Sequence, residues 1–433
     1  MSLWPGLLGF AAVLALIGLR VPVAVAMGIT GAVGLWILNG FDTTWFLLGN
    51  QPFEAVFPYG LSVVPLFIAM GIFAARAGLS RTLYEGVYAF IGHWRGGLAM
   101  ATIGACAAFG AICGSSLATA ATMAKVAMPE MRRRGYDDRL ASASVAAGGT
   151  LGILIPPSLI MIIYALLTEQ SIGALFAAAL LPGVLGTALY MAAIAVQVAR
   201  RPELGPAGDR LSWGQRLRAV IRVWDVTLLF VVVIGGIYAG LFSPTEAAAV
   251  GAFGALLFAA LRRQLDRAAL RQALTETATT SGMIFLIMIG ATLFNSFIEA
   301  TALPQTLVGH LNSLALPPLG VMLMLLVFYF ILGCFMDSLS MVLLTVPVVV
   351  PIILAQGYDP VWFGIVLVTV VEVGLITPPI GMNLFVIQGT TPGLALSTVA
   401  RGILPFVVAD AVRIAFLLAF PALCLWLPKA LGF

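Results

Sequence analysis

Two proline pairs inside apolar segments are the first residues of this chain with consequences for chemistry. Residues 152–158 read GILIPPS and residues 374–380 read GLITPPI. Proline lacks a backbone donor and clashes with the carbonyl four residues earlier, which belongs to Gly152 in one segment and to Gly374 in the other. A helix must break at both places, and each break leaves carbonyls and amides that only a ligand or water can satisfy in hydrocarbon. A cation suits the free carbonyls and an anion suits the free amides.

Hydroxyl groups lie one apolar segment ahead of each proline pair. GSS occupies 114–116 and DSLS occupies 337–340. Both combine hydroxyl oxygens with small side chains, so that a hard cation such as sodium could reach backbone carbonyls. A single proline kink or membrane serine is more often a packing feature. A hydroxyl-rich turn combined with a broken helix, found twice, favours ion binding.

The elements that carry these residues are membrane helices. Apolar residues make up 61% of the 433 residues and charged residues only 9%, against roughly 25% charged residues in soluble domains. The net charge of +4 comes from short basic clusters between apolar runs, which indicates membrane topology and not a nucleic-acid surface. The four cysteines lie in apolar segments without CxxC spacing, so neither disulfides nor a metal site are expected.

Apolar runs and basic loops predict the topology. The first run, 3–19, has no Lys or Arg ahead of it and is predicted to be a retained membrane helix. Loop 39–54 holds Asp42 and Glu54 but no Lys or Arg, which places this loop and the N-terminus on the outer side of the membrane. Residues 82–95 are predicted to form an amphipathic interfacial helix. Single crossings are predicted at 3–19, 22–38, 56–75, 140–166, 173–198, 224–242, 245–261 and 274–298.

Segment 97–127 is predicted to enter the membrane and return. Arg95 precedes it and the arginine cluster 132–134 follows it, so both of its ends face the cytoplasm. About 30 residues rising 1.5 Å each are too short for two full crossings. We therefore expect a re-entrant hairpin that turns at 114–116. A second hairpin, at 319–355, lacks basic flanks and should open to the outside.

The two sets of features form an internal repeat with an offset of 222 residues (374 minus 152). Five predicted crossings separate the copies, so the copies have opposite orientations in the membrane. Inverted repeats with broken helices are the architecture of secondary transporters, whose binding sites lie near the bilayer midplane. The matched positions are Ser116 and Ser338, Pro129 and Pro351, Gly135-Tyr136-Asp137 and Gly357-Tyr358-Asp359, Gly152 and Gly374, and Pro156-Pro157 and Pro378-Pro379.

The sequence resembles the large membrane subunit, of DctM type, of tripartite ATP-independent periplasmic (TRAP) transporters. The resemblance covers essentially the whole chain and is most specific in GAICGSSLATAATMAKVAMPEMRRRGYD (110–137), GTLGILIPPSLIMIIYA (149–165) and GLITPPIGMNLFVIQG (374–389). It implies an all-α elevator-type carrier of the ion-transporter superfamily, with a scaffold and a mobile domain of two re-entrant hairpins and two broken helices. It also implies sodium as the coupling ion, a bacterial inner-membrane location, and neither enzymatic activity nor a cofactor.

The resemblance further implies an organic acid anion as substrate, such as a C4-dicarboxylate, a sialic acid-like compound or a related carboxylate. A periplasmic binding protein of DctP type would deliver it, a small subunit of DctQ type would complete the membrane pair, and lipid would cover the rest. A stand-alone carboxylate symporter is the alternative. An intramembrane enzyme is disfavoured because the chain has no HExxH motif and only two histidines, His93 and His310, outside the proposed core. A channel is disfavoured because such repeats enclose their site.

Carried over residue by residue, the resemblance implies two sodium sites and a substrate site. The first sodium site would use Gly114, Ser115, Ser116, Gly149 and Gly152. The second would use Ser338, Gly374, Thr377 and the backbone of Met382. Substrate contacts are expected from Ser116, Pro156, Ser158, Asp337, Ser338, Ser340, Pro378 and Asn383.

Two acidic residues have several possible roles. Asp337 could ligate sodium, take up a proton or face the outer water, and Glu372 poses the same choice. The repeat counterpart of Glu372 is Thr150, which predicts asymmetry between the two ion sites. No arginine stands out as a carboxylate clamp, since Arg401 is expected in a loop and Arg413 in the scaffold.

The chain is thus predicted to divide into five segments. Residues 1–96 form scaffold helices and the interfacial arm helix of the first repeat, and 97–166 form its hairpin and broken helix. Residues 167–318 hold further scaffold helices, a cytoplasmic loop and a second arm. Residues 319–390 form the second hairpin and broken helix, and 391–433 form a C-terminal scaffold helix.

Overall fold

The computed structural model describes residues 3–313 and 316–433, and every regular element in that part of the chain is helical. Seven segments are long and apolar enough to cross a membrane, or eight if the pair bent by 45° at residue 223 forms one span. The predicted all-α, multi-span class is confirmed. The seven segments are Tyr59–Arg76, Asp138–Thr168, Ile172–Arg200, Pro244–Leu261, Arg267–Ala300, Ser338–Ala355 and Leu396–Ala419.

Two groups of four helices correspond to each other, and two helices of each group have matching boundaries. Helix α7 spans Ser116–Arg133 and α18 spans Ser338–Ala355, while α8 spans Asp138–Leu154 and α19 spans Pro360–Ile376. All four start and end positions are matched at the offset of 222 residues, so the repeat found in the sequence is also a repeat of helix boundaries. The other members are α6 (Gly97–Cys113) and α9 (Leu159–Thr168) in the first group, and α17 (Pro318–Gly333) and α20 (Met382–Thr390) in the second.

The remaining helices precede, separate and follow these two groups. The first group is preceded by α1 (Trp4–Gly18), α2 (Val23–Asn39), α3 (Phe41–Val56), η1 (Tyr59–Ser62), α4 (Val63–Arg76) and α5 (Leu79–Ile91). Between the groups lie α10 (Ile172–Arg200), η2 (Pro202–Leu204), α11 (Trp213–Arg222), α12 (Trp224–Phe230), the π-helical η3 (Val231–Gly235), α13 (Gly236–Tyr238), α14 (Pro244–Leu261), α15 (Arg267–Ala300) and α16 (Leu303–Ser313). The chain ends with α21 (Leu396–Ala419) and α22 (Ala422–Leu431).

Helix α3 replaces the loop predicted at 39–54, and that prediction is wrong. Gly40 ends α2 with a φ of +81°, which a glycine adopts readily, and the chain turns directly into α3. The polar residues that suggested a loop are accommodated on the helix, because the Gln51 amide donates a hydrogen bond of 2.5 Å to the Ser296 hydroxyl on α15. Hydropathy alone does not reveal such a partner on another helix.

Three further predictions, about two connecting segments and the C-terminal segment, need correction. The cytoplasmic loop predicted within residues 167–318 contains helix α11, which begins with a capping box at Ser212. Arg267 and Arg271 lie on α15, which starts with Asp266 as its N-cap and so extends the crossing predicted at 274–298. The C-terminal segment contains two helices, since α21 ends just ahead of Pro421.

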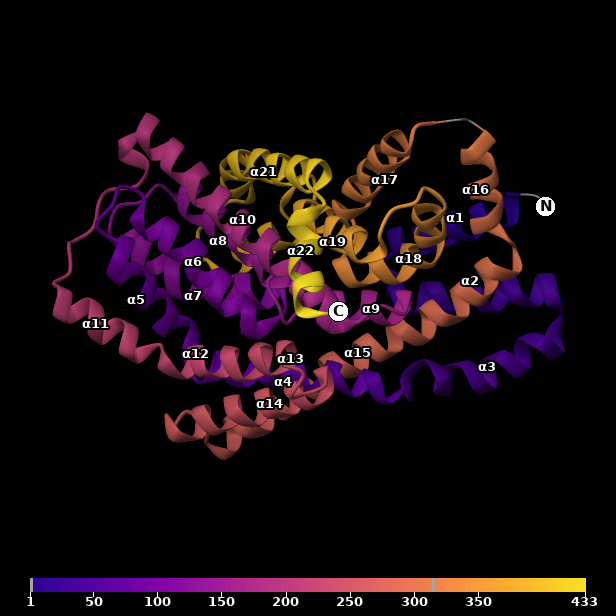
Figure 1. The fold of residues 1–433 in the computed structure, drawn as a ribbon, viewed down its shortest axis with the longest axis horizontal. Helices are drawn as coiled ribbons and strands as arrows, with labels where there is room; N and C mark the ends of the chain where they lie inside the picture. The colour runs from indigo at the N-terminus through magenta and orange to yellow at the C-terminus, as the bar shows by residue number, and fades with distance from the viewer. Residues whose placement is uncertain (1–2, 314–315) are drawn as a thin grey trace.

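The two repeated groups interlock. Helix α7 of the first group packs against α20 of the second, and α18 of the second packs against α9 of the first. Helices α10 and α21 pack against both α8 and α19. Figure 1 shows α8, α10, α19 and α21 in the middle of the molecule, with α1 and α16 towards one end and α5 and α11 towards the other. The centre of the fold is therefore built from both repeats.

Candidate functional site

The turn between α6 and α7 lies against the interruption between α8 and α9. Gly114 has a φ of +64°, and its carbonyl accepts a hydrogen bond of 3.5 Å from the amide of Leu159, the first residue of α9. A β-carbon on Gly114 would lie only 2.9 Å from the Pro157 carbonyl oxygen. Glycine is therefore required here twice over, for its backbone conformation and for its size. The sequence prediction of a turn at 114–116 is confirmed.

Serine side chains cap the helices that start at this contact. The Ser115 hydroxyl accepts a hydrogen bond of 3.4 Å from the Ala118 amide at the start of α7. The Ser158 hydroxyl does the same for the Met161 amide at the start of α9. Ser115 is half-buried and Ser158 is buried. The N-termini of α7 and α9 therefore both lie at the contact between Gly114 and Leu159. Helix N-termini stabilise negative charge and donate hydrogen bonds to it.

Two glycines of α8 allow the turn to approach the broken helix closely. A β-carbon on Gly149 would lie 3.2 Å from the Ser116 carbonyl oxygen, and one on Gly152 would lie 3.1 Å from the Ser115 carbonyl oxygen. The structure therefore brings together all the residues predicted for the first sodium site, which are Gly114, Ser115, Ser116, Gly149 and Gly152. The two carbonyl oxygens that lie against α8 are the kind of ligand that a hard cation takes, and the Ser115 carbonyl also accepts a hydrogen bond of 3.1 Å from the Thr119 amide.

Thr119 belongs to this cluster and was not singled out in the sequence. A β-carbon on Gly152 would lie 2.6 Å from its hydroxyl oxygen. That hydroxyl is buried beside the Cys113 thiol and forms no hydrogen bond of good geometry among the described residues. Its position three residues after Ser116 places it on the same face of α7. This spacing is the signal that could have identified it.

The second turn is arranged differently. Asp337 is the N-cap of α18, and its carboxylate accepts hydrogen bonds of 3.1 and 3.0 Å from the amides of Leu339 and Ser340. It therefore occupies the structural position that Ser115 has in the first repeat, as the offset of 222 residues requires. The close contact to the broken helix comes from Gly333, because a β-carbon on Gly374 would lie 2.5 Å from its Cα.

The second break is also more open than the first. Pro156, Pro157 and Ser158 are buried, whereas Pro378 and Pro379 are exposed. Thr377 is half-buried, and its hydroxyl donates a hydrogen bond of 2.6 Å to the carbonyl of Val373. Met382 is half-buried at the start of α20. The two breaks are therefore in different environments, although their helices have matching boundaries.

Two residues predicted to contact substrate have unsatisfied polar atoms. Asn383 is fully buried and donates a hydrogen bond of 3.2 Å to the Ala146 carbonyl on α8, while its side-chain oxygen has no partner in the described part of the chain. The buried Ser340 hydroxyl is likewise without a partner there. Buried polar groups are normally satisfied, so these atoms are free to bind a ligand or water.

A cluster of buried charged side chains joins α19 and α21. Arg413 on α21 forms ion pairs of 3.1 Å with Glu372 on α19 and 2.8 Å with Asp410, and all three side chains are fully buried. The Tyr190 hydroxyl on α10 donates a hydrogen bond of 2.7 Å to Asp410. Sequence reasoning noted Glu372 and Thr150 but assigned Arg413 only to the scaffold, because an arginine and a carboxylate 41 residues apart carry no local signal of pairing.

The fold is similar to that of a solved membrane protein of known structure. The solved structure of the YdaH transporter of Alcanivorax borkumensis superposes on 96% of this chain with a TM-score of 0.68, over 98% of its own length and at 16% sequence identity. At that identity the likeness concerns the fold alone.

The family follows from the sequence. Residues 10–423 match the family described as the DctM component of the tripartite ATP-independent periplasmic transporters, and the chain belongs to this family. The C4-dicarboxylate TRAP transporter large permease protein DctM of Pseudomonas aeruginosa is 36% identical over 408 residues, with 94% of each chain covered. The isethionate TRAP transporter permease protein DctMQ of Oleidesulfovibrio alaskensis is 33% identical, over 93% of this chain and 63% of that longer protein. The protein is thus a transporter permease subunit and not an enzyme.

Proposed function

We propose that the chain is the sodium-coupled large subunit of an importer for an organic acid anion, delivered by a periplasmic binding protein and carried by an elevator movement. The observation that supports it most directly is the first ion site. Carbonyl oxygens of Ser115 and Ser116 and the hydroxyl of Thr119 face Gly149 and Gly152 at a helix interruption. Such a cluster offers oxygen ligands without a charged side chain, which suits a monovalent hard cation.

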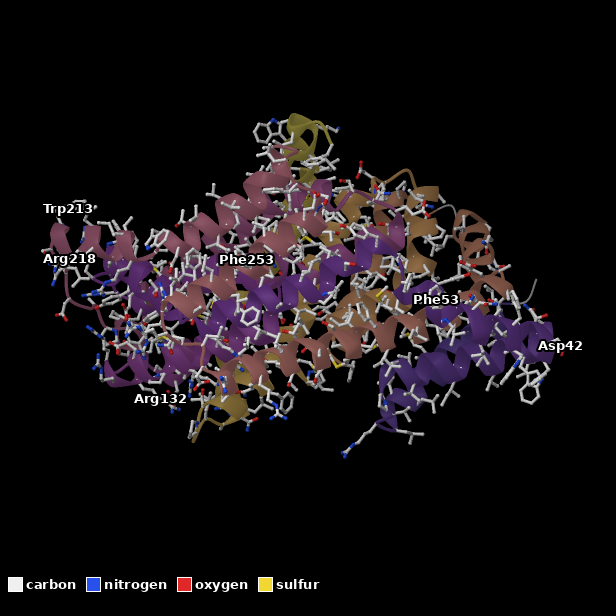
Figure 2. The ribbon with its side chains drawn as sticks, turned by 90° about the horizontal axis from the view of Figure 1, so that it is seen from below. Asp42, Phe53, Arg132, Trp213, Arg218 and Phe253 are labelled. Carbon is white, nitrogen blue, oxygen red and sulfur yellow. The ribbon has the colours of Figure 1, made fainter. Side chains whose placement is uncertain are left out.

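The proposed arrangement in the membrane is a pair of inverted repeats, each with a re-entrant hairpin and a broken helix. The matched helix boundaries and the contacts of α7 with α20 and of α18 with α9 support it. Figure 2 shows Arg132 and Arg218 towards one end of the molecule and Asp42 at the opposite end. Those ends correspond to the proposed cytoplasmic and periplasmic sides, with the N-terminus on the periplasmic side.

The proposed substrate is a carboxylate or a similar small organic anion. The two relatives described above are named as transporters of C4-dicarboxylates and of isethionate, and both substrates are organic anions. In this chain the helix N-termini capped by Ser115 and Ser158 favour negative charge. Asn383 and Ser340 have polar atoms free for hydrogen bonds to a substrate. We place the substrate between the two turns, next to these residues.

The proposed partners are a small membrane subunit of DctQ type and a binding protein of DctP type. The relative named DctMQ supports the first partner. This chain covers 63% of that protein, which leaves a further part of it for a second component, as the name indicates. In proteoliposomes with an inward sodium gradient, we expect labelled C4-dicarboxylate or sulfonate to accumulate only when both partners are present. The control replaces the sodium gradient by a potassium gradient. Equal uptake without a binding protein would favour the stand-alone symporter instead.

Sodium binding can be tested without knowing the substrate. We expect the melting temperature of the detergent-purified protein to rise with NaCl but not with KCl at equal ionic strength. A ligand that binds only the folded state at one hundred times its Kd stabilises that state by about 2.7 kcal/mol. We propose the Ser116 and Ser338 hydroxyls as further ligands beside the backbone carbonyls. Ser116→Ala and Ser338→Ala should therefore each weaken the sodium response, because each removes one hydroxyl oxygen at one of the two sites. An unchanged response in both variants would refute the ligand roles of these serines.

A further inference from the structure

The buried charged cluster connects the two broken helices. Thr150 lies on α8 two residues ahead of Gly152, and Glu372 lies on α19 two residues ahead of Gly374. At a rise of about 1.5 Å per residue, each is about 3 Å along its helix from the glycine at the proposed ion site. The two residues occupy equivalent positions of the repeat.

An unbroken series of polar contacts runs from one of these residues to the other. The Thr150 and Tyr190 hydroxyl oxygens are 3.2 Å apart, and Tyr190 donates to Asp410 at 2.7 Å. Asp410 pairs with Arg413 at 2.8 Å, and Arg413 pairs with Glu372 at 3.1 Å. All five side chains are fully buried. The series passes through α10 and α21, which pack against both α8 and α19.

The surrounding structure makes room for this series. A β-carbon on Gly186 of α10 would lie 2.5 Å from Nη1 of Arg413, so glycine leaves the space that the guanidinium fills. The Arg413 guanidinium also lies over the Tyr190 ring, 5.8 Å from its centroid. On the other side, the Glu372 carboxylate approaches the amide of Leu154, the last residue of α8 before the first break.

Stability alone does not account for such a cluster. Apolar residues of similar volume are often as stabilising as a buried ion pair, because desolvation offsets the electrostatic attraction. Once buried, however, the charges strongly resist separation, since an unpaired charge would remain in a dry interior. The charged pairs therefore resist separation of α19 from α21. The Thr150–Tyr190 contact and the approach of Glu372 to the Leu154 amide extend this link to α8.

We propose that Glu372, Arg413, Asp410 and Tyr190 are positioning residues that couple the two sodium sites. The proposal rests on the proposed function. Sodium bound at one site orders the backbone at that break. The buried link transmits this order to the other break. The second ion then binds to a site that is already formed. Such coupling is reciprocal between the sites.

The test measures the coupling itself. Ser116→Ala weakens the first site by removing the Ser116 hydroxyl, and the sodium concentration for half of the remaining thermal stabilisation then reports mainly the second site. Typical coupling energies correspond to about 5- to 150-fold in affinity. We therefore expect Ser116→Ala to raise the half-saturating concentration of the second site at least about fivefold. In a Glu372→Met background, this shift should vanish, because Met keeps the volume but forms no contact with Arg413.

Control variants separate positioning from general damage. Glu372→Met leaves Arg413 paired with Asp410, so no charge is left unpaired. Glu372→Gln retains an acceptor for Arg413 and should keep most of the coupling. Thr369→Val is the matched control and should behave as the wild type. Within the described part of the chain, this buried hydroxyl donates only to the Ile365 carbonyl of its own helix. If Glu372→Met does not fold, Tyr190→Phe removes the contact with Thr150 and should abolish the same shift.

The outcomes are distinct. A Ser116→Ala shift of equal size in the wild-type, Glu372→Met and Tyr190→Phe backgrounds would overturn the coupling role while leaving sodium binding intact. Loss of coupling in Thr369→Val as well would show that any buried polar change on α19 is enough, and would also overturn it. Absence of any sodium-specific stabilisation in the wild type would refute the proposed sodium coupling and the link together.

Discussion

Replacing Pro156 and Pro157 together by alanine should abolish transport while the protein still assembles in the membrane. A proline in a helix interior costs about 3 kcal/mol, and removing one shifts the balance towards a continuous helix by roughly 100-fold. The interruption between α8 and α9 would then close, and the carbonyls and amides that it frees would bond within the helix. Sodium-driven uptake in proteoliposomes, together with sodium-dependent thermal stabilisation, measures the effect.

A matched proline change separates this result from a general effect of proline removal. Pro182 is buried in the middle of α10, which continues through it as a helix of 29 residues. Pro182→Ala should therefore retain transport and the response to sodium. Wild-type uptake by the Pro156→Ala, Pro157→Ala protein would show that the interruption has no part in the mechanism.

Gly110→Ala and Gly374→Ala should each force a hairpin away from its broken helix. A β-carbon on Gly110 would collide with the Cα of Gly152, and one on Gly374 would lie 2.5 Å from the Cα of Gly333. Backbone cannot yield as a flexible side chain does, and overpacking of this kind typically costs about 1–3 kcal/mol. We expect a lower melting temperature in both variants, and loss of the sodium response at the site concerned.

Gly282 provides the matched control on a membrane helix. It lies inside α15, and a β-carbon there would meet no atom within 4 Å. Gly282→Ala should be neutral or slightly stabilising, because alanine favours a helix by about 1 kcal/mol over glycine. Equal melting temperatures for Gly110→Ala and Gly282→Ala would contradict the close packing of α6 on α8.

The fold could be predicted where the signals were local. The turn at 114–116, the interruptions at both proline pairs and the repeated boundaries of α7, α8, α18 and α19 follow from proline, glycine and capping residues. Helix α3 could not be predicted, because its polar residues are typical of a loop. Gln51 forms its hydrogen bond with Ser296, which lies 245 residues away on another helix. Hydropathy measures how polar a segment is, but it contains no information about a distant partner.

The candidate site shows the same division. The residues predicted for a first sodium site were predicted as a set, and the structure places these residues together. Thr119 was missed, although it lies one helical turn beyond Ser116. The role of Asp337 as the N-cap of α18 could have been inferred from its equivalence to Ser115. Glu372 was noticed as an intramembrane acid, but its partner Arg413 was not recognised.

The amino-acid sequence by itself determined the membrane class, the repeat, and the places where the helices next to the two proline pairs break. Capping residues, proline and glycine act on the backbone within about one turn, so their effects can be predicted from residues close in the sequence. Only the tertiary structure decided that the first break is buried and the second exposed, and that Thr150 and Glu372 are joined through Tyr190, Asp410 and Arg413. Those contacts arise because α10 and α21 pack against both broken helices, and the relative placement of four helices is a property of the whole fold.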